Sequence, residues 1–306
     1  EISLRGRADG GSIFTVILPF ALAAAPTTAR PAPAPAAVGT MRVLLVEDNP
    51  TNRLVAQAML EELGGVSVIT AYDGVGALEA FRDADLILMD CQMPRLDGYE
   101  ATRQIRQIEH KEGRVPIPIV ALTAHALDEE RRRCFEVGMN DFLVKPVLLG
   151  ELAATLRRHL PDAAIATPAE SARPVPSPAA ATDAEAEAEQ LPVLDPGRIE
   201  DLLASLPGQP QAVFLQRVLE TFRRTLDANL VKLQQVDAHD RETVRRAAHT
   251  LKSAAAQVGA MRLSHTAREL EYAARDGKLQ RMVALAAYLP ALANLSWQQL
   301  KERYPA

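Results

Sequence analysis

The stretch LILMDCQMPRLDG, residues 86–98, begins as a run of apolar residues and continues into a turn that contains a proline and a glycine. The apolar run is typical of a strand that is buried on both faces of a parallel sheet. Asp90 stands where the run stops. A carboxylate at this place either forms a turn or belongs to a functional site, and the rest of the chain has to decide between the two.

Short apolar runs alternate with helical segments on both sides of this stretch. The expected strands cover residues 42–46, 66–70, 86–90, 117–123 and 142–144. The expected helices cover residues 50–63 and 74–81, begin after Gly98 and at Asp128, and end with a last helix that reaches Leu160. Five strands that alternate with five helices predict an α/β fold, a doubly wound (βα)5 parallel sheet.

The C-terminal segment, residues 194–305, has no strand pattern. Its helices are delimited by Asp195 and Asp240 at starts and by Gly259 and Gly277 at ends. We therefore expect an all-α domain that forms a helical bundle.

Two segments of biased composition separate these parts. Residues 21–40 are an Ala/Pro linker and residues 161–193 an Ala/Pro/Glu linker, with almost no large apolar residues. The 306 residues thus suit two modest domains, at 41–160 and 194–305, after a short piece at 1–20.

The whole-chain composition excludes several classes of protein. A net charge of -5 with 24% charged residues does not favour direct binding of nucleic acid. Two cysteines indicate a reducing compartment, and proline interrupts both long apolar runs before they could span a bilayer. We expect a soluble, cytoplasmic chain, cut from a longer parent protein whose missing N-terminal region would carry any anchor in the inner membrane.

Polar residues stand at the ends of four of the predicted strands. They are Glu47 and Asp48, Asp90, Thr123, and Lys145. The carboxyl ends of parallel strands form the functional edge of a doubly wound sheet, so these side chains should converge. Three close carboxylates repel one another unless a cation keeps them ionised, and an all-oxygen ligand set favours Mg²⁺.

Each of these residues also has a structural interpretation by itself. Asp48 can begin the turn at Asn49 and Pro50, Asp90 can cap the following loop, and Lys145 can be a solvated strand end. The coincidence at four strand ends favours a site.

The motifs VLLVEDNPTNR, LILMDCQMPRLDG, ALTAHA and FLVKP resemble those of the response-regulator receiver domain, a flavodoxin-like fold, and they span residues 41–160 in the family's order. By this resemblance Asp90 is the phosphoacceptor. Asp48, Asp90 and the backbone carbonyl of Gln92 bind Mg²⁺, and Glu47 acts mainly through water.

The same resemblance assigns the remaining receiver residues. Lys145 supplies a second cation to the transferred phosphoryl group. Thr123 offers its hydroxyl to the phosphoryl oxygens, and Phe142 matches the aromatic switch position, so that phosphorylation is expected to pull Thr123 inward and release the Phe142 ring.

A second informative stretch, VRRAAHTLKSAAAQVGA, covers residues 244–260. Its apolar positions recur at helical spacing and predict one buried stripe: Val244, Ala248, Leu251, Ala255 and Val258. His249 lies off this stripe, with Arg245 and Lys252 on its own face, which predicts a solvent-facing imidazole beside two cations. This is either a chance surface histidine or a nucleophile for phosphoryl transfer.

The segment HTLKSAAAQVGA resembles the histidine phosphotransfer (HPt) domain. The resemblance implies an antiparallel four-helix bundle with His249 as phosphoacceptor and Lys252 as its catalytic neighbour. Ser253 stands where that family commonly has glycine.

The first segment, EISLRGRADGGSIFTVILPF, contains two strand-like runs around a Gly-Gly-Ser turn. By itself it is a hairpin. Ahead of a receiver it resembles the end of a histidine-kinase ATP-binding domain, although the ATP-binding boxes and the kinase histidine are absent from these residues.

These resemblances together predict the C-terminal part of a hybrid sensor histidine kinase. Its expected function is a phosphorelay of a two-component system, from a kinase histidine of the same or a sister chain to Asp90, then to His249, then to a downstream response regulator. Whether these residues act as an enzyme by themselves stays open. The alternatives are a docking module without phosphoryl transfer, which should lack part of the acid cluster, and an aspartyl-nucleophile hydrolase, which should have an acid where Gln92 stands.

Overall fold

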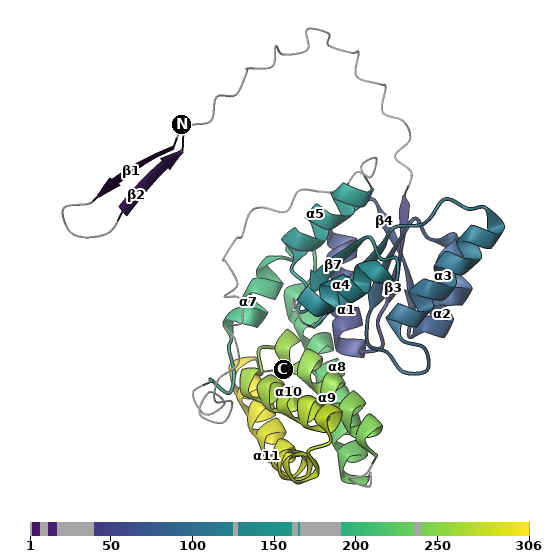
Figure 1. The fold of residues 1–306 in the computed structure, drawn as a ribbon. Coiled ribbons are helices and arrows are strands. Elements are labelled where there is room, and N and C mark those ends of the chain that lie inside the picture. The colour runs from purple at the N-terminus through teal and green to yellow at the C-terminus, as the bar shows by residue number, and fades with distance from the viewer. Residues whose placement is uncertain are drawn as a thin grey trace. The chain divides into compact units, whose positions relative to one another are not determined.

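The computed structural model describes residues 2–6, 12–16, 40–124, 128–160, 165, 191–235 and 240–305. The chain divides into two compact units, residues 1–37 and 38–306. The first unit contains an antiparallel hairpin of β1 (Ile2–Gly6) and β2 (Ser12–Val16), as the two predicted strand-like runs require (Figure 1). Most of the two predicted linkers lies outside the described residues.

A five-stranded sheet forms the centre of the receiver-like part. Its strands are β3 (Met41–Val46), β4 (Val66–Ala71), β5 (Leu86–Asp90), β6 (Ile119–Thr123) and β7 (Asp141–Val144). Their order is β4-β3-β5-β6-β7, and every neighbouring pair is parallel. The predicted doubly wound α/β sheet is therefore confirmed.

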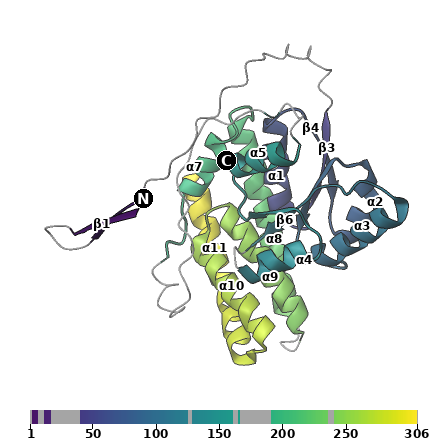
Figure 2. The same cartoon turned by 45° about the horizontal axis from the view of Figure 1, so that its top comes forward.

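Helices cover both faces of this sheet. They are α1 (Pro50–Glu62), α2 (Gly74–Ala80), α3 (Gly98–Glu112), α4 (Asp128–Glu136) and α5 (Leu149–His159). Val43 and Leu45 belong to the core that contains α1 and α5, whereas Leu44 and Val46 belong to the core under α2, α3 and α4. This alternation follows from the two-residue period of a strand. Helices α2 and α3 lie side by side in both ribbon views (Figures 1 and 2).

The C-terminal part is helical, as predicted. It comprises α7 (Gly197–Ala204), α8 (Gln211–Gln235), α9 (Arg241–Gln257), α10 (Met261–Asp276) and α11 (Leu279–Arg303). Contacts run from α8 to α9, α10, α11 and back to α8, which closes a four-helix bundle (Figure 2). The five residues of the predicted stripe on α9 are all buried.

The predicted helix boundaries have identifiable physical causes. The Asp240 side chain accepts a hydrogen bond from the backbone N–H of Thr243, and Gly277 adopts a left-handed conformation at the end of α10. Gly259 also has a positive φ of 74°, and a Cβ atom there would lie 2.2 Å from the carbonyl oxygen of Asp195. Glycine is required at this position because the start of α7 approaches its backbone closely.

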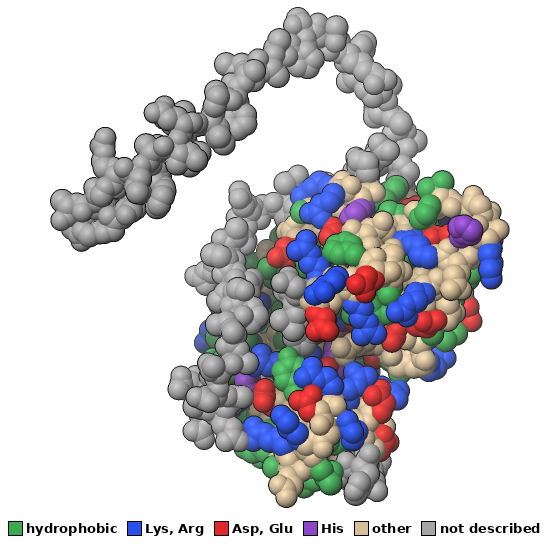
Figure 3. All heavy atoms as spheres, in the orientation of Figure 1, with side chains coloured by type: hydrophobic (Ala, Val, Ile, Leu, Met, Phe, Trp, Pro, Cys, Tyr) green, Lys and Arg blue, Asp and Glu red, His purple; other side chains and the backbone are tan. Residues whose placement is uncertain are grey.

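The visible surface of the described residues carries both signs of charge. In Figure 3, Lys and Arg side chains are interspersed with Asp and Glu side chains over the face that is shown. This face thus has the mixed charge of an ordinary protein surface.

Candidate functional site

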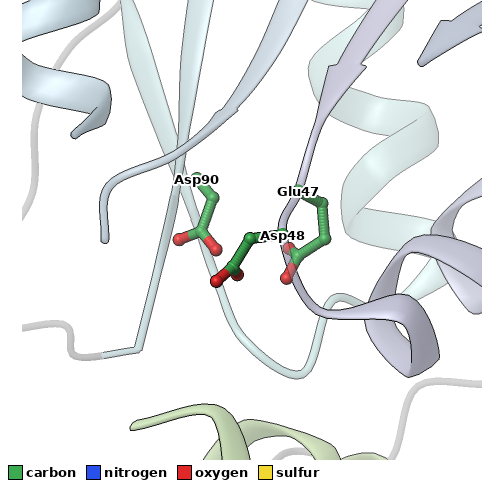
Figure 4. Close-up of side chains that lie close together, drawn as sticks. All are labelled: Glu47, Asp48 and Asp90. Carbon is green, nitrogen blue, oxygen red and sulfur yellow. The ribbon is translucent and has the colours of Figure 1, made fainter. Parts of the chain in front are cut away.

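Three carboxylates meet at the carboxyl edge of the sheet. Glu47 and Asp48 directly follow β3, and Asp90 is the last residue of the neighbouring β5. Because Val46 pairs with Met89 in parallel register, the residues that follow them, Glu47 and Asp90, lie side by side at the ends of the two strands. One carboxylate oxygen from each acid lies within 4.8 Å of those of the other two, and the three side chains point toward a common space (Figure 4).

Lys145 enters the same cluster from the end of β7. Its Nζ atom lies 2.6 Å from Oε2 of Glu47 and 2.7 Å from Oδ2 of Asp90, and its side chain is 8% exposed. The peptide bond that follows, between Lys145 and Pro146, is cis. The structure brings together four of the five side chains that were predicted to converge, whereas the fifth, Thr123, is hydrogen-bonded to Glu130 on α4.

Burial opposes the ionisation of these acids. Burial and the nearby charge of Asp90 raise the pKa of Glu47 to about 8, and the same two causes raise the pKa of Asp48 to about 6. Burial by itself would lower the pKa of Lys145, but the facing carboxylates of Asp90 and Glu47 raise it above its ordinary value. The cluster therefore holds more negative charge than one ammonium group balances.

The donor set fits a small divalent cation. Three carboxylates supply hard oxygen ligands, and a bound cation would remove the repulsion that raises the pKa of Glu47 and Asp48. The Gln92 backbone N–H donates to Oδ1 of Asp90 at 3.2 Å, which places the predicted carbonyl ligand in the adjacent loop.

The loop after Asp90 depends on one glycine. A Cβ atom on Gly98 would lie 2.1 Å from the carbonyl oxygen of Asp90, which no side chain can tolerate. The Gly98 N–H instead donates to the carbonyl oxygen of Cys91 at 3.1 Å. Gly98 was not among the predicted site residues, and only the close approach of the two backbones reveals its role.

The two predicted switch residues have partners on α4. The Thr123 hydroxyl donates to Oε2 of Glu130 at 2.9 Å. The Phe142 ring packs edge-on against Phe135, with 6.5 Å between ring centroids, and the Arg131 guanidinium lies 5.3 Å from the Phe142 centroid. Thr123 and Phe142 are thus both in contact with side chains of α4.

The histidine of the bundle is buried, which corrects the prediction of a solvent-facing imidazole. His249 is 7% exposed and Lys252 is 6% exposed. The Nδ1 atom of His249 lies 2.9 Å from Oε1 of Glu271 on α10, and Nζ of Lys252 lies 2.6 Å from Oε2 of the same carboxylate. The prediction was wrong because the helical pattern of α9 does not show what packs across that face.

Glu271 determines which nitrogen of His249 carries the proton. The carboxylate accepts a hydrogen bond, so the neutral imidazole carries its proton on Nδ1 and keeps a lone pair on Nε2. Burial lowers the pKa of His249, against the opposing hydrogen bond to Glu271. Burial by itself would raise the pKa of Glu271, but His249 and Lys252 lower it to about 2. A neutral nucleophile beside an ionised carboxylate is suited to attack on phosphorus.

The sequence carries a signal for Glu271 that was missed. Ala267, Glu271 and Ala274 share the buried face of α10, so Glu271 is a charged residue within an apolar stripe. Buried acids are rarely found without a partner, and this pattern predicts one.

These features define two kinds of domain: a doubly wound domain with an acid cluster and a lysine at its strand ends, and a four-helix bundle that presents a histidine. Family models agree with both. The model described as "Response regulator receiver domain" matches residues 43–157, and the model described as "Hpt domain" matches residues 217–302. The chain therefore contains a receiver domain and an Hpt domain, a combination that fits the predicted C-terminal part of a hybrid sensor histidine kinase.

Similar proteins include sensor kinases. Sensor histidine kinase GacS of Pseudomonas protegens is 46% identical over 114 residues, covering 37% of this chain and 12% of that protein. Autoinducer 2 sensor kinase/phosphatase LuxQ of Vibrio cholerae is 43% identical over 145 residues, covering 45% of this chain and 16% of that protein. The chain thus spans less than a fifth of the length of these two relatives.

Among solved structures, the receiver domain of the sensor histidine kinase PA1611 from Pseudomonas aeruginosa, with a magnesium ion in its active site cleft, is 47% identical. The match covers 39% of this chain and 95% of that chain, with a TM-score of 0.35.

Among the helices of the described residues, none is long and apolar enough to cross a bilayer.

Proposed function

We propose that this chain relays a phosphoryl group from a kinase histidine to Asp90, from Asp90 to His249, and from His249 to a downstream response regulator. The observation that carries the proposal is the pair of complete sites: the acid cluster with its lysine, and the buried histidine with its carboxylate. The proposed limits are 41–160 for the receiver and 194–305 for the Hpt domain, and the family matches lie inside both ranges.

In the first step, a carboxylate oxygen of Asp90 attacks phosphorus and the N–P bond of the donor phosphohistidine breaks. The negative charge that spreads over the phosphoryl oxygens needs cations nearby. Lys145 provides one, since its Nζ atom lies 2.7 Å from Asp90. A Mg²⁺ ion bound by Asp48, Asp90 and the Gln92 carbonyl would supply the other, with Glu47 acting through water. The Thr123 hydroxyl would leave Glu130 to bond the new phosphoryl oxygens and so allow Phe142 to move.

In the second step, Nε2 of His249 attacks the phosphorus on Asp90. An N–P bond forms, the acyl O–P bond breaks, and the Asp90 carboxylate is regenerated. The proton on Nδ1 stays in its hydrogen bond with Glu271, which balances the charge that develops on the imidazole. Lys252 holds that carboxylate in place through its own ion pair.

The partners follow from the two ends of this relay. The upstream partner is a histidine-kinase domain, on the same or a sister chain, and residues 1–20 are proposed as the end of its ATP-binding domain. The downstream partner is the receiver of a separate response regulator. A docking module without transfer is disfavoured because none of the three acids, Lys145 or His249 is missing.

A single labelling experiment tests the relay. The full chain is incubated with acetyl phosphate and Mg²⁺, and the label is assigned to Asp90 or His249 by its stability in base, which preserves phosphohistidine and cleaves acyl phosphate. Wild type should label both residues, His249→Gln only Asp90, and Asp90→Ala neither. Label on His249 in Asp90→Ala would reverse the proposed order, and a wild-type chain that takes up no label would end the proposal.

A further inference from the structure

One side-chain amide at the rim of the receiver contacts the reactive helix of the Hpt domain. Asn49 directly follows the acids of β3, and its Nδ2 atom donates to the carbonyl oxygen of Thr250 at 3.1 Å and to Oγ of Ser253 at 3.0 Å. Asn49 is 1% exposed and Ser253 is 8% exposed. Both belong to the same compact unit of the chain.

The orientation of this amide has no alternative. Oδ1 of Asn49 accepts a hydrogen bond from the Thr51 backbone N–H at 3.0 Å and so caps the start of α1. The atom that caps a helix start must accept a hydrogen bond from a backbone N–H, whereas the carbonyl oxygen of Thr250 needs a donor. The cap therefore turns both protons of Nδ2 toward α9, and a flipped amide would lose all three bonds.

The Ser253 hydroxyl extends the contact to the reactive residue. While its oxygen accepts from Asn49, its own proton is shared between the carbonyl oxygens of His249, at 3.2 Å, and Thr250, at 3.3 Å. A continuous set of hydrogen bonds thus connects the backbone beside Asp48 with the backbone of His249.

A second contact lies on the other side of His249. Nη1 of Arg245, one helical turn before His249, lies 3.3 Å from Oε1 of Gln92, whereas Ser253 lies one turn after it. Asn49 follows Asp48, and Gln92 stands two residues after Asp90. One contact therefore lies on each side of His249 along α9, and each is made by a receiver residue that is close in sequence to an acid of the cluster. Together the two contacts set the register of α9 relative to the acid cluster. In this arrangement the charge of Asp90 also acts on the pKa of His249.

From this register we propose that Asn49 is a specificity-determining residue that matches the receiver to the Hpt domain of its own chain. The inference rests on the proposed relay and adds the contact that selects the pair. A receiver with an acceptor in place of the Nδ2 group would face the Thr250 carbonyl with like partial charge and would be rejected, because an unpaired buried acceptor costs more than a hydrogen bond gains.

Three variants separate docking from the cap of α1. Asn49→Ser keeps an N-cap oxygen and removes the Nδ2 donor, and Asn49→Asp keeps the cap and the size but replaces the donor with an acceptor. Ser253→Ala removes one of the two acceptors on α9. Ser296→Ala is the matched control, because this buried serine also bonds to the carbonyl four residues before it but lies on α11.

The assay measures transfer from phospho-Asp90 to His249 in the full chain after a pulse of acetyl phosphate and Mg²⁺. In wild type the transfer should be first order, with a rate that does not change with protein concentration. The rate should fall at least about tenfold in Asn49→Ser and further in Asn49→Asp, but less in Ser253→Ala. In the double variant that combines Asn49→Ser with Ser253→Ala, the two effects should not add, because the two residues share a hydrogen bond. Labelling of Asp90, measured in a His249→Gln background, and the rate in Ser296→Ala should not change.

Equal transfer rates in wild type, Asn49→Ser and Asn49→Asp would show that Asn49 serves only as a cap and would overturn the inference. A rate that rises in proportion to protein concentration would overturn it as well, because the contact would then form between chains. Both results differ from failure of the relay itself, in which wild type would place no label on His249.

Discussion

The Glu271→Gln variant removes a buried charge and keeps the shape of the side chain. Oε1 of Glu271 lies 2.9 Å from His249, Oε2 lies 2.6 Å from Lys252, and the side chain is 7% exposed. A glutamine can accept one hydrogen bond, but its amide nitrogen then faces either the imidazole N–H or the ammonium group. We expect the bundle to be less stable and His249 to lose the partner that orients it.

The size of the effect follows from the pKa of Glu271. Burial by itself would raise this pKa, but His249 and Lys252 lower it from 4.5 to about 2. A pKa that is lower by one in the folded chain than in the unfolded chain corresponds to about 1.4 kcal/mol, so the ionised carboxylate stabilises the fold by about 3 kcal/mol. This agrees with the cost of about 3–5 kcal/mol for removing one partner of a buried ion pair.

The pH dependence has a defined sign. A carboxylate with a lowered pKa contributes its full stability above its unfolded pKa of 4.5 and loses it as the pH falls toward 2. The lowered pKa of His249 acts in the same direction, because below about pH 6.5 the unfolded chain takes up a proton more readily than the folded one. Wild type should therefore lose stability in acid, and Glu271→Gln should lose less of it below pH 4.5.

The measurement is urea unfolding of the full chain, followed by the fluorescence of its single tryptophan, Trp297 on α11. At pH 7 the variant should be about 3 kcal/mol less stable than wild type, and at pH 3 this difference should shrink to about half or less. Asp227→Asn is the control, because it removes an exposed acid that is paired on α8 and should change stability by less than about 0.5 kcal/mol. Equal stability of Glu271→Gln and Asp227→Asn at pH 7, or a difference that does not change with pH, would refute the reasoning.

Three further predictions concern the receiver. Lys145→Met removes the ammonium group that is paired with Glu47 and Asp90. At saturating Mg²⁺ it should slow the labelling of Asp90 by acetyl phosphate at least about tenfold, and unchanged labelling would exclude a role for the ammonium group. Mg²⁺ should bind more weakly at pH 5.5 than at pH 7.5 in calorimetry, because protons compete for the carboxylates of Glu47 and Asp48, whose pKa values are raised to about 8 and about 6. In Gly98→Ala the new Cβ atom would lie 2.1 Å from the Asp90 carbonyl oxygen and would force the loop away from it. This variant should therefore lower the free energy of unfolding by about 2–3 kcal/mol, and a variant as stable as wild type would contradict the reasoning.

Most of the fold could be predicted from local patterns. The apolar strands, the helices between them and the caps at Asp240 and Gly277 occur where residue spacing placed them. These features depend on neighbours within a few residues, so a linear sequence contains the information. The acid cluster could be predicted for a related reason, because parallel strands bring their carboxyl ends to one edge whatever their order.

The surroundings of His249 could not be predicted in this way. The pattern of α9 placed the imidazole off the buried stripe, but a stripe describes only one face of one helix. Glu271 comes from α10, twenty-two residues further along the chain, and Asn49 comes from another domain.

The sequence by itself determined the two kinds of domain, the carboxylates at the strand ends and the position of His249, the proposed phosphoacceptor. Only the tertiary structure decided that His249 is buried, that its Nδ1 atom faces a carboxylate, and that an amide of the receiver bonds to the same helix. The physical reason is that secondary structure follows from short-range periodicity, whereas the pKa and reactivity of a buried group depend on whichever charges and donors packing brings within a few ångström of it.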